Sequence, residues 1–238
     1  MKIIVEVIGK VDQGYSNPYE CLDEDGNSFI VKGLPRSSQV NEWICANLAT
    51  AFGLPIADYE LVEIPEELYF ELDFDTQFDL GCGPIFGSKK IQLAQWFEPK
   101  TMQHIVTEEE KIKIFLFDYW VRNADRNSNN TNLLVSDRRI RVIDHNSAFD
   151  KKYTRDDVYS HLFYDQVNKE RLNDLVFRAE LSGQIEDILL NLNNIIGSLP
   201  EEWQYSDSPI NTLKADIDLV AIKSTLSRYT DDDFWFFV

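Results

Sequence analysis

The chain has 238 residues, of which 44% are hydrophobic, enough to form a sizeable core in one large domain or in two small lobes. Its 41 acidic and 23 basic residues give a net charge of -18, which excludes a broad basic face for nucleic acid and disfavours binding to an anionic membrane. The most apolar run, I-F-L-F-D-Y-W, is interrupted at Asp118, so we expect no membrane-spanning helix and no stable membrane association.

The cysteines favour a cytoplasmic protein, the N-terminus predicts a strand, and the histidines argue against a zinc site. Glu6 and Lys10 interrupt the apolar first residues and no small-residue cleavage site follows, so we expect a strand there and not a signal peptide. The three cysteines are odd in number and widely spaced, which is typical of reduced thiols. None of the three histidines has a ligand-like spacing to a cysteine, so zinc chemistry is not expected.

The first residues have the pattern of a small antiparallel sheet. Segments 3–8, 19–22 and 28–31 alternate between apolar and polar residues as strands do, and D-E-D-G-N between the last two predicts a tight turn. Apolar residues then recur at helical spacing, and Gly53 is a natural stop, so a helix is predicted near 38–52.

The segment after this helix predicts fewer regular elements. We expect a strand at 59–64 and an acidic aromatic loop at 69–78. The glycines and proline of L-G-C-G-P-I-F-G-S predict irregular structure, and I-Q-L-A-Q-W-F predicts a strand.

The second half of the chain is rich in helical patterns. Thr107 and Glu110 form a capping box before an apolar run that predicts a buried helix to about Arg122. Further helices are predicted near 167–180, 183–196 and 211–228. The pattern is that of an α+β protein, with a mainly antiparallel sheet and one helix in residues 1–98 and a mainly helical part in residues 99–238.

The stretch N-A-D-R-N-S-N-N-T-N-L-L-V-S-D-R-R-I-R-V-I-D, which ends at Asp144, has the layout of a phosphoryl-transfer site. Asp125 is followed five residues later by Asn130, and a hairpin then returns a second acid, Asp144. Protein kinases use this order for a catalytic Asp and two metal ligands. The alternative is a polar turn whose side chains bind their own backbone. Arg126 would pair with a substrate phosphate or with the loop itself, and the sequence does not separate the two.

Two residues upstream can supply the contact to nucleotide phosphates. Lys32 ends the strand S-F-I-V-K, and Glu42 lies in the first turns of the predicted helix, where it can hold the Lys32 ammonium. The alternative is a solvated strand end, with Glu42 engaged in a cap interaction with Ser38.

The weakest part of the pattern is the loop that would cradle the nucleotide. Gly9 and Gly14 bracket V-I-G-K-V-D-Q-G-Y-S-N-P, in which backbone amides and the Ser16 hydroxyl can face phosphate oxygens. A plain hairpin connection is the alternative. Trp96, at the boundary of the two halves, is a candidate for the adenine-side hinge or a packing aromatic.

Five segments of the chain resemble the HipA-like kinases of bacteria. They read G-Y-S-N-P, F-I-V-K, N-E-W-I-C-A-N-L-A-T-A-F-G-L-P-I, N-A-D-R-N-S-N-N-T-N-L-L and V-I-D-H, between about Gly9 and Phe149. The resemblance implies a two-lobed protein-kinase-like fold, with an N-lobe at 1–98 and a C-lobe at 99–238. It also implies that Lys32 binds ATP, that Asp125 is the catalytic Asp, and that Asn130 and Asp144 hold magnesium.

The resemblance leaves the substrate open. HipA phosphorylates a protein serine and is held by a DNA-binding antitoxin, which implies a protein Ser/Thr substrate and an antitoxin or other protein partner. Asn127 and Asn129 stand where HipA has His and Lys, and the D-R pair is shared with phosphatidylinositol-kinase-like enzymes. A lipid or small-molecule kinase is therefore one alternative. A non-catalytic binding module, using the acidic face or the aromatic end D-D-D-F-W-F-F-V, is another.

Overall fold

The computed structural model describes residues 1–11, 18–206 and 209–236. The chain divides into two compact units, each built from separate stretches of sequence. Unit 1 comprises Met1–Trp43, Ala57–Gln92 and Ser198–Ile217, and unit 2 comprises Ile44–Ile56, Leu93–Gly197 and Asp218–Val238. The lobe boundary predicted at 98/99 stays a prediction.

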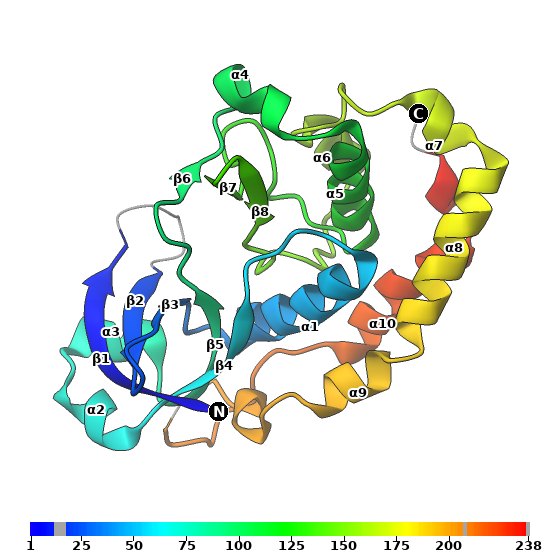
Figure 1. The fold of residues 1–238 in the computed structure, drawn as a ribbon. Coiled ribbons are helices and arrows are strands. Elements are labelled where there is room, and N and C mark those ends of the chain that lie inside the picture. The colour runs from blue at the N-terminus through cyan, green and yellow to red at the C-terminus, as the bar shows by residue number, and fades with distance from the viewer. Residues whose placement is uncertain (12–17, 207–208, 237–238) are drawn as a thin grey trace. The chain divides into compact units, whose positions relative to one another are not determined.

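Unit 1 is built around a closed five-stranded barrel in the order β1-β2-β3-β5-β4 (Figure 1). Its strands are β1 (Lys2–Lys10), β2 (Tyr19–Asp23), β3 (Ser28–Val31), β4 (Tyr59–Ile64) and β5 (Gly83–Lys89). All neighbouring pairs are antiparallel except β1 and β4, which pair in parallel. The predicted small antiparallel sheet is therefore a barrel, and one parallel pair closes it.

The turn predicted at D-E-D-G-N joins β2 to β3. Asp23 Oδ1 accepts hydrogen bonds from the backbone N–H groups of Asp25 (2.9 Å) and Asn27 (2.7 Å). Gly26 has a φ of 78°, a left-handed conformation that glycine adopts without steric cost. This turn sets the register in which Cys21 lies opposite Phe29, and both side chains point into the barrel core.

Three expectations for unit 1 are wrong. The expected acidic loop at 69–78 contains α2 (Glu66–Glu71) and α3 (Phe74–Leu80), so the described residues of the N-terminal part form three helices and not one. Asp73 begins α3 because its side chain accepts a hydrogen bond from the N–H of Thr76. The segment expected to be irregular forms β5, a strand paired on both sides, because Gly83 and Pro84 stand at its first two positions. There they do not interrupt the ladder.

The helix predicted near 38–52 is α1 (Arg36–Phe52). Its residues to Trp43 belong to unit 1 and those from Ile44 to unit 2. In unit 1, Arg36 is buried and donates hydrogen bonds to the carbonyls of Cys82 (3.0 Å) and Pro84 (3.2 Å). The start of α1 is thereby fixed to the beginning of β5.

Unit 2 contains a small antiparallel sheet and most of the helices. The sheet has the order β6-β7-β8, from β6 (Gln95–Trp96), β7 (Leu133–Ser136) and β8 (Arg139–Val142). Of the strand predicted at I-Q-L-A-Q-W-F, only Gln95 and Trp96 form a strand among the described residues. The capping box of Thr107 and Glu110 is present and begins α5 (Glu108–Trp120), as predicted. The short helix α4 (Pro99–Met102) lies between β6 and β7 in sequence, and α6 (Arg155–Ser160) follows β8.

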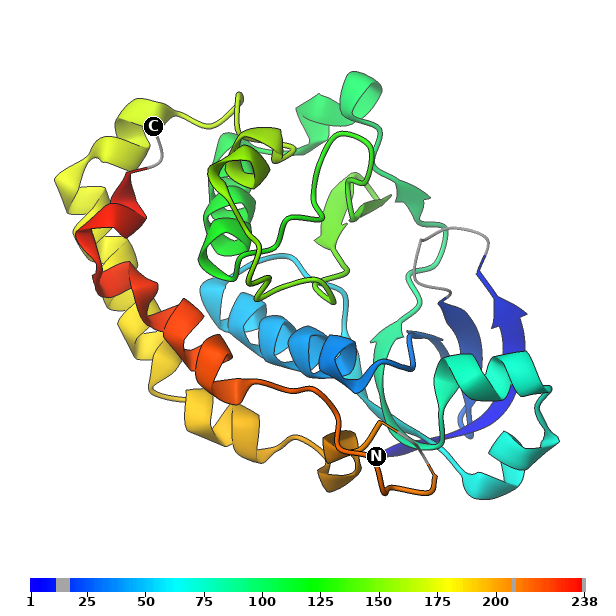
Figure 2. The ribbon, with the colours of Figure 1, turned by 180° about the vertical axis from the view of Figure 1, so that it is seen from behind.

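The C-terminal helices of unit 2 have different boundaries from those that the sequence pattern predicts. Two helices are predicted, at 167–180 and 183–196. The structure has three in this region, α7 (Lys169–Asn173), α8 (Leu175–Leu189) and α9 (Leu192–Gly197). Asp174 accepts a hydrogen bond from the N–H of Phe177, which caps α8 and separates it from α7. The last helix is α10 (Leu219–Ser227), and the segment after it lies beside α8 (Figure 2).

In the part of the chain that the structure describes, no helix is long and apolar enough to cross a membrane. The three cysteines are buried, and none of them forms a disulfide bond.

Substitution of Gly33 by Ala should destabilise unit 1. A Cβ at this position would lie 2.2 Å from the carbonyl oxygen of Leu80 and 2.3 Å from its Cα, and these backbone atoms cannot move aside without shifting α3. We expect a loss of about 1–3 kcal/mol in the free energy of unfolding, measured with urea. Gly183→Ala, in an α8 position with open space around it, is the control and should be neutral or slightly stabilising. Equal effects of the two substitutions would contradict the packing argument.

Candidate active site

Asp125 is held from both sides by asparagine side chains of its own loop. Its Oδ1 accepts a hydrogen bond from Asn130 Nδ2 (2.9 Å), and its Oδ2 accepts one from Asn132 Nδ2 (3.3 Å). The backbone N–H of Asp125 donates to Asn123 Oδ1 (3.4 Å). Asp125 itself is only partly buried. Its carboxylate is therefore fixed in direction while part of it remains accessible.

The polar-turn alternative applies to Asn127 and not to Asp125. Asn127 Oδ1 accepts hydrogen bonds from the backbone N–H groups of Asn129 (2.9 Å) and Asn130 (3.1 Å). The N–H of Asn127 in turn donates to the carbonyl of Asn130 (2.9 Å). Asn127 thus makes the turn, and the turn brings Asn130 back toward the carboxylate of Asp125.

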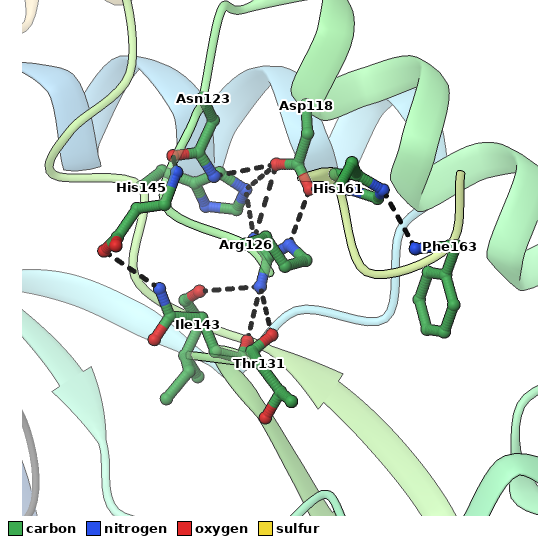
Figure 3. A network of polar contacts seen from close by, with 10 residues as sticks. Asp118, Asn123, Arg126, Thr131, Ile143, His145, His161 and Phe163 are labelled. Carbon is green, nitrogen blue, oxygen red and sulfur yellow. Dashed lines mark hydrogen bonds and ion pairs between the residues drawn. The ribbon is translucent and has the colours of Figure 1, made fainter. Parts of the chain in front are cut away.

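Arg126 contacts the loop itself. Its side chain is completely buried, and its Nη1 donates to the carbonyl oxygens of Asn132 (2.5 Å), Thr131 (3.3 Å) and Ile143 (3.4 Å), as Figure 3 shows. Ile143 directly precedes Asp144, and its N–H donates to the carbonyl of Asn132 (3.1 Å). One guanidinium group therefore fastens the Asp125 loop to the backbone that carries Asp144.

Asp118 of α5 is the counter-ion of Arg126. Its Oδ2 lies 2.6 Å from Arg126 Nε, and its Oδ1 accepts a hydrogen bond from Asn123 Nδ2 (2.9 Å). Burial alone would raise the pKa of Asp118, but the Arg126 guanidinium, supported by His145 and His161, holds that pKa well below its usual range. The pair is a charged one, and it lies in the interior of unit 2.

Two buried histidines complete the network. His161 Nδ1 accepts the backbone N–H of Phe163 (3.1 Å), so the neutral ring carries its proton on Nε2 and donates it to Asp118 (3.0 Å). Burial lowers the pKa of His161, against the opposing effect of Asp118. His145 Nε2 lies 3.2 Å from Arg126 Nη2 and acts as acceptor there, because a guanidinium group can only donate.

Asp144 follows β8 in a left-handed backbone conformation, with a φ of 63°. Asp tolerates this region better than most residues, and a non-glycine residue in this region is typical of functional sites. Asp144 is partly buried, whereas the next residue, His145, is buried in the network of Arg126. Asp125 and Asp144 are thus partly exposed, whereas Arg126 and His145, which hold the surrounding backbone in place, are buried.

Lys32 and Glu42 form an ion pair within unit 1. The Lys32 Nζ lies 3.6 Å from Glu42 Oε1, and the side chains are 19% and 8% exposed. The predicted proximity of these two residues is therefore present. Their role in binding nucleotide phosphates stays a proposal.

The other predicted site residues are placed less completely. Gly14 and Ser16 lie outside the described residues. Trp96 is half-buried in β6, where it pairs with Leu134 in unit 2. Sequence reasoning did not find Asn132 or Asp118. The N-x-N spacing of 130 and 132 is a signal for the first, whereas nothing local to Asp118 shows that it would be buried beside Arg126.

Comparisons with known proteins agree with this geometry. A family model described as "HipA-like kinase" matches residues 4–238. The chain belongs to the HipA-like kinase family. A search of curated proteins gave no match.

Solved structures show the fold of this HipA-like kinase. One similar structure is the crystal structure of a Golgi casein kinase with Mn and ADP bound. The two sequences are 12% identical, the superposition covers 96% of this chain and 72% of the casein kinase chain, and the TM-score is 0.54. The Helicobacter pylori proinflammatory kinase CtkA is 11% identical and covers 94% of this chain and 91% of its own, with a TM-score of 0.49. The similarity to the Golgi casein kinase structure shows a kinase-like fold with mixed α and β content.

The donor set of this HipA-like kinase fits a magnesium ion bound together with phosphates. Asn130 uses its Nδ2 to hold Asp125, which directs its amide oxygen away from that carboxylate. With the carboxylate of Asp144 this gives oxygen ligands only, which is what Mg²⁺ prefers. Magnesium at kinase sites is usually bound by one or two side chains and the substrate phosphates, so two protein ligands are sufficient.

Removal of either partner of the buried ion pair should be costly. Arg126→Met leaves Asp118 as an uncompensated buried charge, and we expect it to lower the free energy of unfolding by about 3–5 kcal/mol. Asp118→Leu should cost a similar amount because it leaves the guanidinium unpaired. The double variant should cost less than the sum by about 1–3 kcal/mol, measured by urea unfolding of all four proteins. Strict additivity would mean that the pair has no coupling.

Stability should fall in mildly acidic solution because of His161. Its folded-state pKa is lowered, so below pH 6.5 the unfolded chain binds a proton that the folded protein does not. The free energy of unfolding should therefore decrease as pH falls through this range, by at most about 1.4 kcal/mol per pH unit from this group. His161→Gln should flatten the profile between about pH 6.5 and 5, whereas the same change at exposed His104 should not. Parallel profiles for wild type and His161→Gln would refute the assignment.

Proposed function

We propose that this HipA-like kinase transfers the γ-phosphoryl group of ATP to a Ser/Thr hydroxyl of a protein, with magnesium as its metal. The observation that carries the proposal is the carboxylate of Asp125, fixed by Asn130 and Asn132 and still partly accessible. Phosphoryl transfer requires little covalent chemistry from the protein and depends on positioning and charge. This loop supplies the positioning.

Asp125 would orient the acceptor hydroxyl and take its proton. Each carboxylate oxygen has two lone pairs, and the asparagine amides use one on each oxygen, so a hydroxyl can donate to another. A magnesium ion held by Asn130 and Asp144 would neutralise charge that develops on the phosphates. Lys32, held by Glu42, would contact the nucleotide phosphates in the same reaction.

Three further points belong to the proposal. The Golgi casein kinase was solved with Mn and ADP, which supports the use of a nucleotide and a divalent metal. We propose a protein acceptor and an antitoxin-like or other protein partner on the basis of the family. We propose a cytoplasmic location because the three cysteines are buried and none forms a disulfide bond.

A lipid or small-molecule kinase is the second candidate, because Arg126 follows Asp125 as in phosphatidylinositol-kinase-like enzymes. The buried position of Arg126 means that this D-R pair has a structural explanation whatever the acceptor is. Incubation with labelled ATP and a panel of protein and lipid acceptors would separate the two candidates. The net charge of -18 favours the protein acceptor over an anionic membrane.

Asp125→Ala should abolish phosphate transfer and leave the fold intact. We expect a loss of at least about 100-fold in the rate, because a general base typically contributes that much or more. The measurement is phosphate incorporation by mass spectrometry, first on the protein itself and then on a cell lysate. Asp156→Ala, at an exposed position of α6, is the matched control and should keep full activity. Full activity of Asp125→Ala would sink the assignment.

Magnesium-dependent ATP binding should require Asp144 and Lys32. A ligand that binds only the folded state raises the melting temperature, so ATP with magnesium should stabilise the wild type. The shift should be lost in Asp144→Asn and reduced in Lys32→Met, and it should persist in Asp156→Asn. Absence of any shift in the wild type would support the non-catalytic binding module.

A further inference from the structure

The α2–α3 segment of unit 1 exposes three phenylalanines. Phe70, Phe74 and Phe78 are 64%, 79% and 71% exposed, although large apolar side chains are normally buried. Phe74 and Phe78 stand four residues apart on α3 and therefore lie on one face of that helix. Exposed aromatic side chains grouped in this way are typical of an interaction surface.

These phenylalanines stand on a rigid support. Leu68, Tyr69 and Leu72 pack against the barrel core from the other face of the segment. Figures 1 and 2 both show α2 and α3 against the strands of the barrel. The segment is therefore a folded platform with an apolar inner face and an outer face that carries the phenylalanines.

The C-terminal end of α3 is fastened to the rest of unit 1. Asp79 accepts a hydrogen bond from the Tyr19 hydroxyl (2.9 Å) and pairs with Lys10 (2.8 Å). Its carbonyl accepts the N–H of Leu34 (2.9 Å), two residues after Lys32. The outer face is thereby connected to the strand end that carries Lys32.

The charge around the phenylalanines has one sign. Residues 66–79 include six acidic residues and no basic one, and residues 59–88 contain no Lys, Arg or His. Asp73 caps α3 and Asp79 is paired with Lys10, whereas Glu66, Glu67, Glu71 and Asp75 are exposed. A partner that covers the phenylalanines must also face these carboxylates.

We propose that the outer face of α2–α3 binds a protein segment that is basic and amphipathic, with apolar anchors flanked by Lys or Arg. Apolar anchors would cover Phe74 and Phe78, and cationic side chains would meet Glu67, Glu71 and Asp75. A symmetric contact with a second copy of the chain is disfavoured, because it would place these carboxylates against their own copies. The same charges disfavour an anionic lipid surface.

Three labelled helical peptides of equal length test the proposal by fluorescence anisotropy. The first has Leu on one face and Lys elsewhere, the second has Glu in place of Lys, and the third keeps Lys but has Ser in place of Leu. The first should bind at least about tenfold more tightly than the others. Equal binding of the first and third peptides would mean attraction by net charge alone and would overturn the proposal.

Variants of the full chain locate the binding. Phe74→Ser combined with Phe78→Ser should weaken binding of the first peptide at least about tenfold. Glu67→Gln combined with Glu71→Gln and Asp75→Asn should also weaken this binding and reduce its dependence on salt. Leu175→Ser combined with Val176→Ser, at exposed apolar positions of α8, is the matched control and should bind like the wild type. Unchanged binding by the Phe74/Phe78 variant would refute the site.

Sedimentation of the chain without peptide tests whether a second copy of the chain, and not a basic peptide, binds this face. The wild type should behave as one copy at the concentrations of the binding experiment. Self-association that is lost in the Phe74/Phe78 variant would identify a second copy as the occupant and overturn the proposal. These measurements do not depend on catalysis, so a chain without kinase activity can still bind the basic peptide.

Discussion

The buried ion pair of Asp118 and Arg126 is the constraint on which the candidate site depends. Arg126 donates to carbonyls on both sides of the site, at Asn132 and at Ile143, and so fixes two segments that are distant in sequence. A guanidinium group buried for this purpose requires a counter-ion, which Asp118 supplies from α5. The hydrogen bond between Ile143 and Asn132 and the pairing of β7 with β8 join the same two segments, and Arg126 adds a connection through its guanidinium group.

The residues proposed to act on the substrate could be identified from spacing, whereas those that hold them could not. The order and spacing of Asp125, Asn130 and Asp144 can be recognised in the sequence, because only a loop and one hairpin separate them. The partner of Arg126 lies eight residues earlier in α5, where Asp118 appears in the sequence as an interruption of an apolar run. Its burial is a tertiary property, and a pattern of alternating residues contains no information about which charges will meet inside the protein.

The secondary structure shows the same difference between elements that local sequence patterns predict and elements that depend on tertiary contacts. Strands β1 to β4 and helices α1 and α5 have periodic patterns or caps, and they are where the sequence predicts them. The strand β5 was missed because its glycines and proline are turn residues by composition, and only pairing with β3 and β4 makes the segment a strand. Helices α2 and α3 are short and carry apolar residues on their exposed face, at Phe70, Phe74 and Phe78, as well as on their inner face, so no helical stripe marks them in the sequence.

The position of Arg126 also bears on how charge is balanced during phosphate transfer. Because Arg126 is buried against Asp118, its positive charge is already neutralised and its donors are used by carbonyl groups. The chain as a whole is strongly acidic, so it offers little general attraction to an anionic nucleotide. Lys32 itself is partly neutralised by Glu42, 3.6 Å away. With ATP as the proposed substrate, we expect its negative charge to be balanced mainly by the divalent metal that we propose at Asn130 and Asp144, so that binding of nucleotide depends strictly on that metal.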